Sequence, residues 1–238
     1  MTLPLYLQIT VGVIVGVGSY FIGNINTAVA LSKLKGKDIR KCGSGNPGTM
    51  NMIRTFGKPF GALTLLLDVA KGVLPSLLGW LFIGNGEFLR LGADRLGLYV
   101  GGLCAEIGHI YPVAMKFKGG KGVATLLGVC LTCKPVIWVA SMAVGIAFLF
   151  VAKIGSLTSF IMMCAPLAVE GVVMSTAPLG AWYSALIFSM FALTLFAHRK
   201  NLVKLFSGNE RLVVLKKSKR LIVIVDRSIL FDGTLIAE

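Results

Sequence analysis

The sequence predicts an all-α integral membrane protein, a seven-span helical bundle with its N-terminus outside and its C-terminus in the cytoplasm. Of the 238 residues, 55% are hydrophobic and only 14% are charged, whereas a soluble domain usually has about 25% charged residues. Seven apolar runs follow one another, and basic residues gather in the segments on one side of them. This composition excludes a soluble globular domain, a disordered chain and a disulfide-rich secreted scaffold.

The apolar runs set the expected helices, because the bilayer core requires roughly 20 apolar residues of helix. They cover residues 4–32, 59–83, 96–113, 122–133, 135–152, 157–174 and 178–196. The fourth run is short for a span, so we expect it to be tilted, broken or shielded by its neighbours.

The distribution of basic residues gives the orientation. Of the 24 Lys and Arg residues, 20 lie in the loops after the first, third and fifth runs and in the tail after the seventh. Cytoplasmic segments carry such an excess, so this side is predicted to be cytoplasmic. The net charge of +14 has the same origin, and no nucleic-acid partner is expected.

Two regions are expected along the chain. Residues 1–212 form the membrane-embedded domain, and residues 213–238 form a cytoplasmic C-terminal extension of unknown role. The extension contains two apolar stretches, 221–225 and 228–231, which are too short to span a membrane. Their length suits strands, so a hairpin-like tail is predicted.

The first basic loop, residues 40–54, combines glycines with small polar side chains. Gly48 lets the backbone approach a ligand closely. Ser44, Asn46 and Asn51 supply neutral hydrogen-bond groups. Arg54 offers a planar fork of donors suited to phosphate or carboxylate. The pattern favours an anion site over an ordinary turn that carries positive charge.

The second basic loop contains Gly119-Gly120-Lys121-Gly122 and leads into the fourth apolar run at Thr125. It fails the Walker A spacing, because Lys121 is followed by glycine rather than by Ser or Thr. Backbone N–H groups and a helix N-terminus can still point at an anion, and Lys121 adds a compact charge. A phosphate-binding turn is therefore predicted.

Polar residues inside the apolar runs are candidates for function, because they are costly in a membrane. Asp68 and Lys71 lie three residues apart in the second run and can pair on one helical face. They either serve a ligand or neutralise each other and orient helices. Glu106 and His109 have the same spacing in the third run, where His109 either anchors the following loop or contacts a ligand.

A third basic element follows the seventh run. His198 and Asn201 lie one helical turn apart and can face the same site. Glu210 follows in the same segment, and Ser156 adds a hydroxyl at the head of the sixth run. By the predicted topology all three basic elements fall on the cytoplasmic side, which suits a site that joins a water-soluble phosphate to a lipid-soluble chain.

Together these motifs resemble the PlsY family of bacterial acyl-phosphate:glycerol-3-phosphate acyltransferases, in the family's order. The matching residues are Ser44, Asn46, Gly48, Asn51, Arg54, Asp68, Lys71, Gly72, Pro75, His109, Pro112, Gly119 to Thr125, His198, Asn201 and Glu210. The Gly-Gly-Lys-Gly-Val-Ala-Thr block is the most specific of them. The resemblance covers about residues 10 to 212.

The resemblance implies an inner-membrane enzyme of phospholipid synthesis with a cytoplasmic active site. It acylates the 1-hydroxyl of glycerol 3-phosphate from a fatty acyl phosphate, and gives lysophosphatidate and phosphate. Lys121, His198, Ser156 and Asn201 are implied to be catalytic. The residues implied to bind substrate are Ser44, Asn46, Gly48, Asn51, Arg54, Asp68, Lys71, His109, Gly119, Gly120, Gly122, Thr125 and Glu210. The expected partners are the two substrates and membrane lipid, the expected state is a monomer, and no metal or cofactor is expected.

The chain departs from the family at Gly155, where a serine is usual, and at Lys204, where an arginine is usual. No His-x-x-x-x-Asp motif follows His109 or His198, so acyl-CoA chemistry is not indicated.

Two other functions are compatible with the sequence: a transporter or channel for an organic phosphate, and a non-catalytic lipid-binding or scaffold protein.

Overall fold

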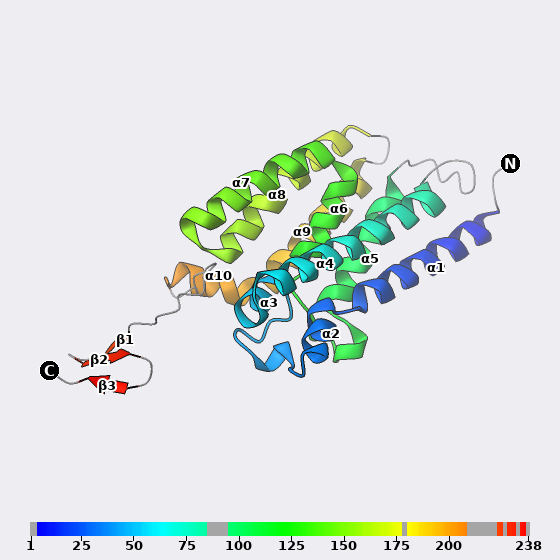
Figure 1. Cartoon of the computed structure of the whole chain (residues 1–238). Coiled ribbons are helices and arrows are strands. Elements are labelled where there is room, and N and C mark those ends of the chain that lie inside the picture. Colours follow the sequence, from blue (N-terminus) through cyan, green and yellow to red (C-terminus); the bar gives the residue numbers. More distant parts are fainter. Residues whose placement is uncertain are drawn as a thin grey trace.

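A computed structural model of the chain describes residues 4–84, 95–177 and 180–208, and the strands at 223–225, 228–231 and 234–236. Up to residue 208 the described elements are helical (Figure 1). They are α1 (Leu5–Asn24), α2 (Thr27–Leu34), η1 (Ile39–Lys41), α3 (Thr49–Phe56), α4 (Lys58–Gly79), the π turn η2 (Trp80–Gly84), α5 (Leu96–Ile110), η3 (Val113–Met115), α6 (Val123–Cys133), α7 (Pro135–Ala152), α8 (Gly155–Ser175), α9 (Gly180–Ala197) and α10 (Arg199–Phe206).

Five segments are long and apolar enough to cross a membrane: Tyr6–Leu34, Lys58–Ile83, Pro135–Ala152, Gly155–Ser175 and Gly180–Ala197. The helix α5 has 15 residues and α6 has 11, which correspond to about 22 and 16 Å. Both are shorter than the roughly 30 Å hydrocarbon core. The integral membrane bundle is thus confirmed, and the count of seven spans stays a prediction.

The first apolar run corresponds to one candidate span, Tyr6–Leu34, but it contains two helices. The apolar run 4–32 is divided at Ile25 and Asn26 into α1 and α2. The side chain of Asn26 accepts a hydrogen bond of 2.9 Å from the backbone N–H of Val29 and caps α2. Asparagine is a strong N-cap residue, and the cap starts a new helix inside an apolar segment.

The short α6 is shielded, as the sequence predicts. It packs against α4, α5 and α8, and Leu126, Leu127 and Val129 are almost fully buried. Elsewhere the helices approach very closely at glycines. A Cβ atom on Gly79 of α4 would lie 1.9 Å from the carbonyl oxygen of Gly97 of α5, so this crossing excludes a side chain there.

The C-terminal extension contains three short antiparallel strands, β1 (Val223–Val225), β2 (Ser228–Phe231) and β3 (Thr234–Ile236), in the order β1-β2-β3. In the registers, Ile224 pairs with Ile229 and Leu230 pairs with Leu235. The predicted hairpin is confirmed, and a third strand, absent from the prediction, extends it.

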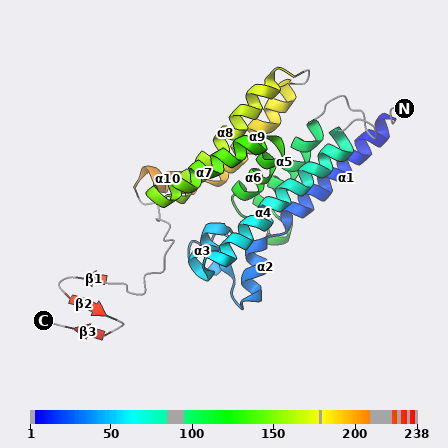
Figure 2. The ribbon, with the colours of Figure 1, turned by 45° about the horizontal axis from the view of Figure 1, so that its top comes forward.

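The basic elements lie at one end of the helical bundle. In both views α2, α3 and α10 occupy the end away from the start of α1 (Figures 1 and 2). The loop between α5 and α6 reaches the same end, because Tyr20 and Asn24 near the end of α1 accept hydrogen bonds from the backbone N–H groups of Val113 and Ala114.

Candidate active site

The Gly-Gly-Lys-Gly turn folds back onto the end of α5. The backbone N–H of Gly119 donates to the carbonyl of Ile110 at 3.0 Å, and that of Gly120 donates to the carbonyl of His109 at 3.1 Å. A Cβ atom on Gly119 would lie 2.0 Å from this His109 oxygen, and one on Gly120 would lie 2.1 Å from the His109 Nε2 atom. These glycines let the turn lie directly on buried His109, which anchors it.

The turn ends at the start of α6, where Gly122 has φ +86° and precedes the first helical residue. Thr125 follows one turn into the helix and is fully buried. The Thr125 Oγ1 and His109 Nδ1 atoms are both buried and have no hydrogen-bond partner among the described residues. Two polar atoms beside the turn are thus available to a ligand or a water molecule.

His198 lies at the end of α9 and is 2% exposed. Its Nδ1 atom is 2.9 Å from the carbonyl oxygen of Thr194. A carbonyl can only accept, so Nδ1 carries the proton in the neutral ring and Nε2 is left as an acceptor. Burial, with the nearby positive charge of Lys121, lowers the pKa of His198 to about 4, so the ring is neutral at pH 7.

Contacts bring the four residues predicted to be catalytic to the same region. Gly122, next to Lys121, lies against α9, because a Cβ atom on it would be 3.0 Å from the Thr194 hydroxyl oxygen. The His198 ring packs on Phe160 of α8 at 5.3 Å between centroids. Buried Ser156 is one turn from Phe160 on the same helical face, and the backbone N–H of Asn201 donates to the His198 carbonyl at 2.7 Å.

The depressed pKa of His198 makes a prediction about stability in acid. An unfolded histidine has a pKa of about 6.5, so between that value and about 4 the unfolded state binds more protons. The stabilisation is complete above pH 6.5 and is lost as the pH falls through 4. At pH 5 the loss is about 2 kcal/mol, or roughly 4–8 °C in Tm.

The variant His198→Gln cannot titrate, so its Tm should fall less between pH 7.5 and pH 5 than that of the parent. Thermal unfolding in detergent at the two pH values measures the difference. An equal fall in both proteins would contradict a buried, neutral His198.

In the first basic loop, Asn51 serves the loop itself. Its side-chain oxygen accepts from the backbone N–H of Ser44 at 3.0 Å, and its amide donates to the carbonyls of Ile39 and Cys42. Asn51 is 1% exposed, so these hydrogen bonds are buried and fix the conformation of the loop. Exposed Ser44 and half-buried Asn46 come shortly before the α3 N-terminus, which follows Gly48 and where no side chain caps the backbone N–H groups.

Arg54 follows on α3 and is half-buried. The other arginine of the loop, Arg40, forms an ion pair of 2.6 Å with Asp38, and its hydrogen bond holds the pKa of Asp38 at about 2. The two basic loops are packed together, because Met115 from the second loop contacts a buried cluster formed by Ala28, Val29, Ile39 and Met52 around the first.

Asp68 and Lys71 form the predicted pair and also close the junction between α1 and α2. Their charged atoms are 2.9 Å apart, and both side chains are buried. Asp68 accepts a hydrogen bond of 2.5 Å from the Thr27 hydroxyl, and Lys71 donates to the carbonyl of Ile25 at 2.8 Å. These contacts give the pair a structural role, and a role in substrate binding stays a prediction.

The sequence interpretation missed a second buried charge cluster. Glu170 of α8 is 1% exposed, and its carboxylate is 2.7 Å from Arg95 and 3.2 Å from Lys134. Tyr99 donates a hydrogen bond to the same carboxylate. The cluster joins the start of α5 to the α6–α7 junction, at the opposite ends of these helices from the turn.

Of the predicted site residues, Glu210 lies outside the described residues. Within the described ranges no group of three or more His, Cys, Asp or Glu side chains is arranged to hold a metal ion.

The chain is similar to known proteins over most of its length. The family described as glycerol-3-phosphate acyltransferase matches residues 13–208. The glycerol-3-phosphate acyltransferase of Myxococcus xanthus is 40% identical over 197 residues, which are 81% of this chain and 94% of that protein. The Finegoldia magna enzyme of the same name is 37% identical over 200 residues, which are 83% and 94% of the two chains.

The fold is also similar to solved structures. The crystal structure of PlsY, an integral membrane glycerol 3-phosphate acyltransferase, in its glycerol 3-phosphate form has a TM-score of 0.73 and 31% identity. The match covers 84% of this chain and 94% of that one. The lysophosphatidic acid form has a TM-score of 0.70 and 30% identity, over 86% and 96% of the two chains.

Proposed function

The chain belongs to the glycerol-3-phosphate acyltransferase family, and from this premise we propose that it moves a fatty acyl group from acyl phosphate to the 1-hydroxyl of glycerol 3-phosphate. The products are lysophosphatidate and inorganic phosphate. The observation that carries the proposal is the family match over residues 13–208, which includes all three basic elements of the site. Related crystal structures of PlsY in glycerol 3-phosphate and lysophosphatidic acid forms support the substrate and the product.

The phosphate groups bind at the second basic loop. Backbone N–H groups at the start of α6 and the charge of Lys121 stabilise an anion. Arg54, with Ser44 and Asn46 near the start of α3, adds a second set of donors. The packing of Met115 against the first loop supports this division, because it keeps the two loops together at one end of the bundle.

The reaction is a transfer between two oxygen atoms. The hydroxyl oxygen of glycerol 3-phosphate attacks the acyl carbon, a new ester bond forms, and the bond from the acyl carbon to the phosphate oxygen breaks. The hydroxyl proton passes to the departing phosphate, which is a good leaving group. Positioning and charge stabilisation then supply most of the catalysis.

His198, Ser156 and Asn201 position the reacting groups. The neutral tautomer of His198 presents Nε2 as an acceptor, which suits orientation of the substrate hydroxyl. Ser156 and Asn201 contribute further hydrogen-bond groups. His109 and Thr125 have unpartnered polar atoms beside the turn, which suits contact with substrate.

The enzyme acts from the cytoplasmic side of a bacterial inner membrane, as a monomer with its N-terminus outside. The concentration of 20 of the 24 basic residues on one side supports this orientation. The acyl donor enters from the bilayer and glycerol 3-phosphate from water, so a site at the membrane surface serves both.

The proposal predicts donor specificity in a direct assay. Purified protein with palmitoyl phosphate and labelled glycerol 3-phosphate should form lysophosphatidate, and EDTA should leave the rate unchanged. Palmitoyl-CoA at the same concentration should give little product. Product from palmitoyl-CoA alone, or loss of activity in EDTA that a divalent ion restores, would contradict the proposed chemistry.

A further inference from the structure

Buried Glu106 and Thr194 meet directly behind the phosphate turn, and neither belongs to the predicted site. We propose that they form a positioning pair that keeps the Gly-Gly-Lys-Gly turn in register with His198. The inference rests on the proposed function, because it concerns how the same site is assembled. The pair contacts neither substrate nor reacting atoms, so its effect passes through the turn and the histidine.

Glu106 and Thr194 join two helices through buried side chains. Glu106 is on α5 and Thr194 is on α9, and both are fully buried. The Thr194 hydroxyl donates a hydrogen bond of 2.6 Å to Glu106 Oε1. A buried polar contact between two helices fixes their relative position more narrowly than apolar packing does, because its geometry is directional.

The pair also lies against the last glycine of the turn. A Cβ atom on Gly122 would lie 3.0 Å from the Thr194 hydroxyl oxygen and 3.2 Å from Glu106 Oε1. The last glycine of the turn therefore lies directly against both members of the pair. If either oxygen moves, the backbone of Gly122 that packs against it moves too, and the adjacent Lys121 is displaced with it.

Thr194 also contacts His198. The carbonyl of Thr194 accepts from Nδ1 of His198 at 2.9 Å, and the hydroxyl of the same residue reaches Glu106. One residue thus links the turn, through Glu106 and Gly122, to the tautomer and orientation of His198.

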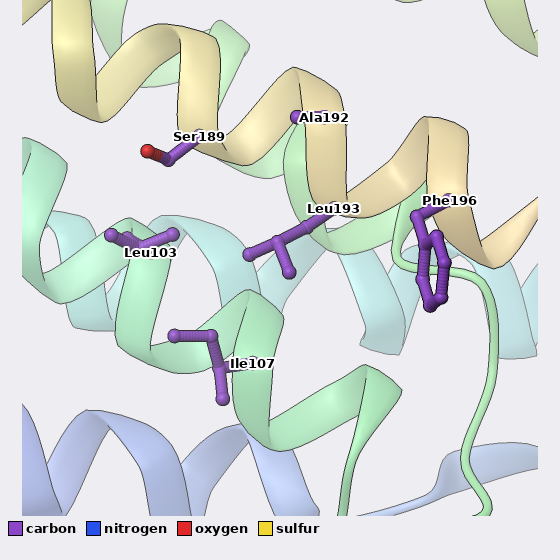
Figure 3. Close-up of a pocket in the computed structure, with 6 residues that line it drawn as sticks. All are labelled: Leu103, Ile107, Ser189, Ala192, Leu193 and Phe196. Atoms are coloured by element: carbon purple, nitrogen blue, oxygen red, sulfur yellow. The ribbon is translucent and has the colours of Figure 1, made fainter.

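Farther from the turn, α5 and α9 also pack through apolar side chains, where the rings of Tyr99 and Tyr183 are 5.6 Å apart. On their outward side, α5 and α9 are separated by a groove of about 400 Å³ (Figure 3). Its lining is apolar except for one hydroxyl and comprises Leu103, Ile107, Ser189, Ala192, Leu193 and Phe196. On the buried side of the same helices, the Glu106–Thr194 hydrogen bond is a directional contact between α5 and α9 near the turn.

The test is the isosteric variant Thr194→Val, which removes the hydroxyl and keeps the carbonyl and the volume. We expect kcat/KM to fall roughly three- to tenfold, as for loss of one hydrogen bond, with a raised KM for glycerol 3-phosphate. The stabilisation of the protein by glycerol 3-phosphate in thermal unfolding should weaken in parallel. Thr194→Ser restores the hydroxyl, and Glu106→Gln keeps an acceptor, so both should approach the parent.

The matched control is Ser189→Ala on the same helix. Its hydroxyl donates to the Ala185 carbonyl in its own helix and lines the outward groove, so its loss should leave KM unchanged. If Thr194→Val fails to fold, Thr194→Ala replaces it with the same expectation. Parent kinetics and parent ligand stabilisation in the folded Thr194 variant would overturn the positioning role. Absence of turnover and of ligand stabilisation in the parent protein would instead contradict the proposed function, and this inference with it.

Discussion

Replacement of Lys71 by methionine should lower the free energy of unfolding by about 3–5 kcal/mol, because it leaves the buried carboxylate of Asp68 without its counter-charge. The change also removes the donor to the Ile25 carbonyl at the junction between α1 and α2. Methionine has a similar length and fills the same space, so the loss is that of the charge and its hydrogen bonds. Reversible unfolding in mixed micelles measures the difference.

Two control variants test whether the loss of stability comes from the unpaired buried charge. Lys58→Met removes an exposed lysine at the start of the same helix and should change stability little. The double variant Asp68→Asn/Lys71→Met removes both charges and should recover at least half of the loss, since no unpaired charge is then buried. If the single Lys71 variant is as stable as the Lys58 variant, the pair does not hold the helix junction.

Removal of the Lys121 side chain should produce the largest loss of activity. Lys121→Ala deletes a charge-assisted hydrogen bond to phosphate of about 1.5–3 kcal/mol, which corresponds to a fall of roughly 10- to 150-fold in kcat/KM. Arg54→Ala should cost a similar factor, because it removes a donor fork from the neighbouring loop. Steady-state rates with varied glycerol 3-phosphate and varied acyl phosphate give the values.

Lys118→Ala is the matched control for this loss. Lys118 is an exposed residue of the same loop, three positions before Lys121, and the sequence interpretation assigns it only to the excess of positive charge in that loop. Its replacement should change kcat/KM by less than about twofold, within the effect of a surface substitution. Equal losses at Lys118 and Lys121 would show that general positive charge, and not the turn, binds phosphate.

The helices were predictable because their signal is local. An apolar run long enough for the bilayer has few alternatives to a helix, and the runs at 135–152, 157–174 and 178–196 match α7, α8 and α9 closely. The turn around Lys121 was also predictable, since its glycines and lysine are consecutive. Its support by His109 agrees with the anchoring role that the sequence left open.

The break at Asn26 escaped the sequence interpretation, because average hydropathy is insensitive to a single capping residue. Asn26 followed by Thr27 was the signal that could have located it. The shortness of α6 was readable from the sequence, because the apolar run 122–133 is too short to span the bilayer core alone, and the helix has 11 residues.

The contacts of the buried polar residues could not be predicted, because their partners are distant in the chain. The spacing of Asp68 and Lys71 indicates their pairing, but the Ile25 carbonyl lies 46 residues from Lys71. For Glu106 the spacing suggested His109, whereas its hydrogen bond goes to Thr194, 88 residues away. Helical periodicity reports neighbours on one face and contains no information on which helix covers that face.

The most direct test of the account is an experimental structure of the protein with glycerol 3-phosphate bound. We predict that the phosphate lies within hydrogen-bond distance of the Lys121 ammonium group and of the backbone N–H groups of Gly122 and Val123, with the glycerol hydroxyls toward His198. Among the described residues, Lys71 at the α1–α2 junction and the Arg95 and Lys134 pair at Glu170 are alternative basic positions, each in contact with a buried carboxylate. A phosphate bound at either of these, with the turn unoccupied, would contradict the proposed active site.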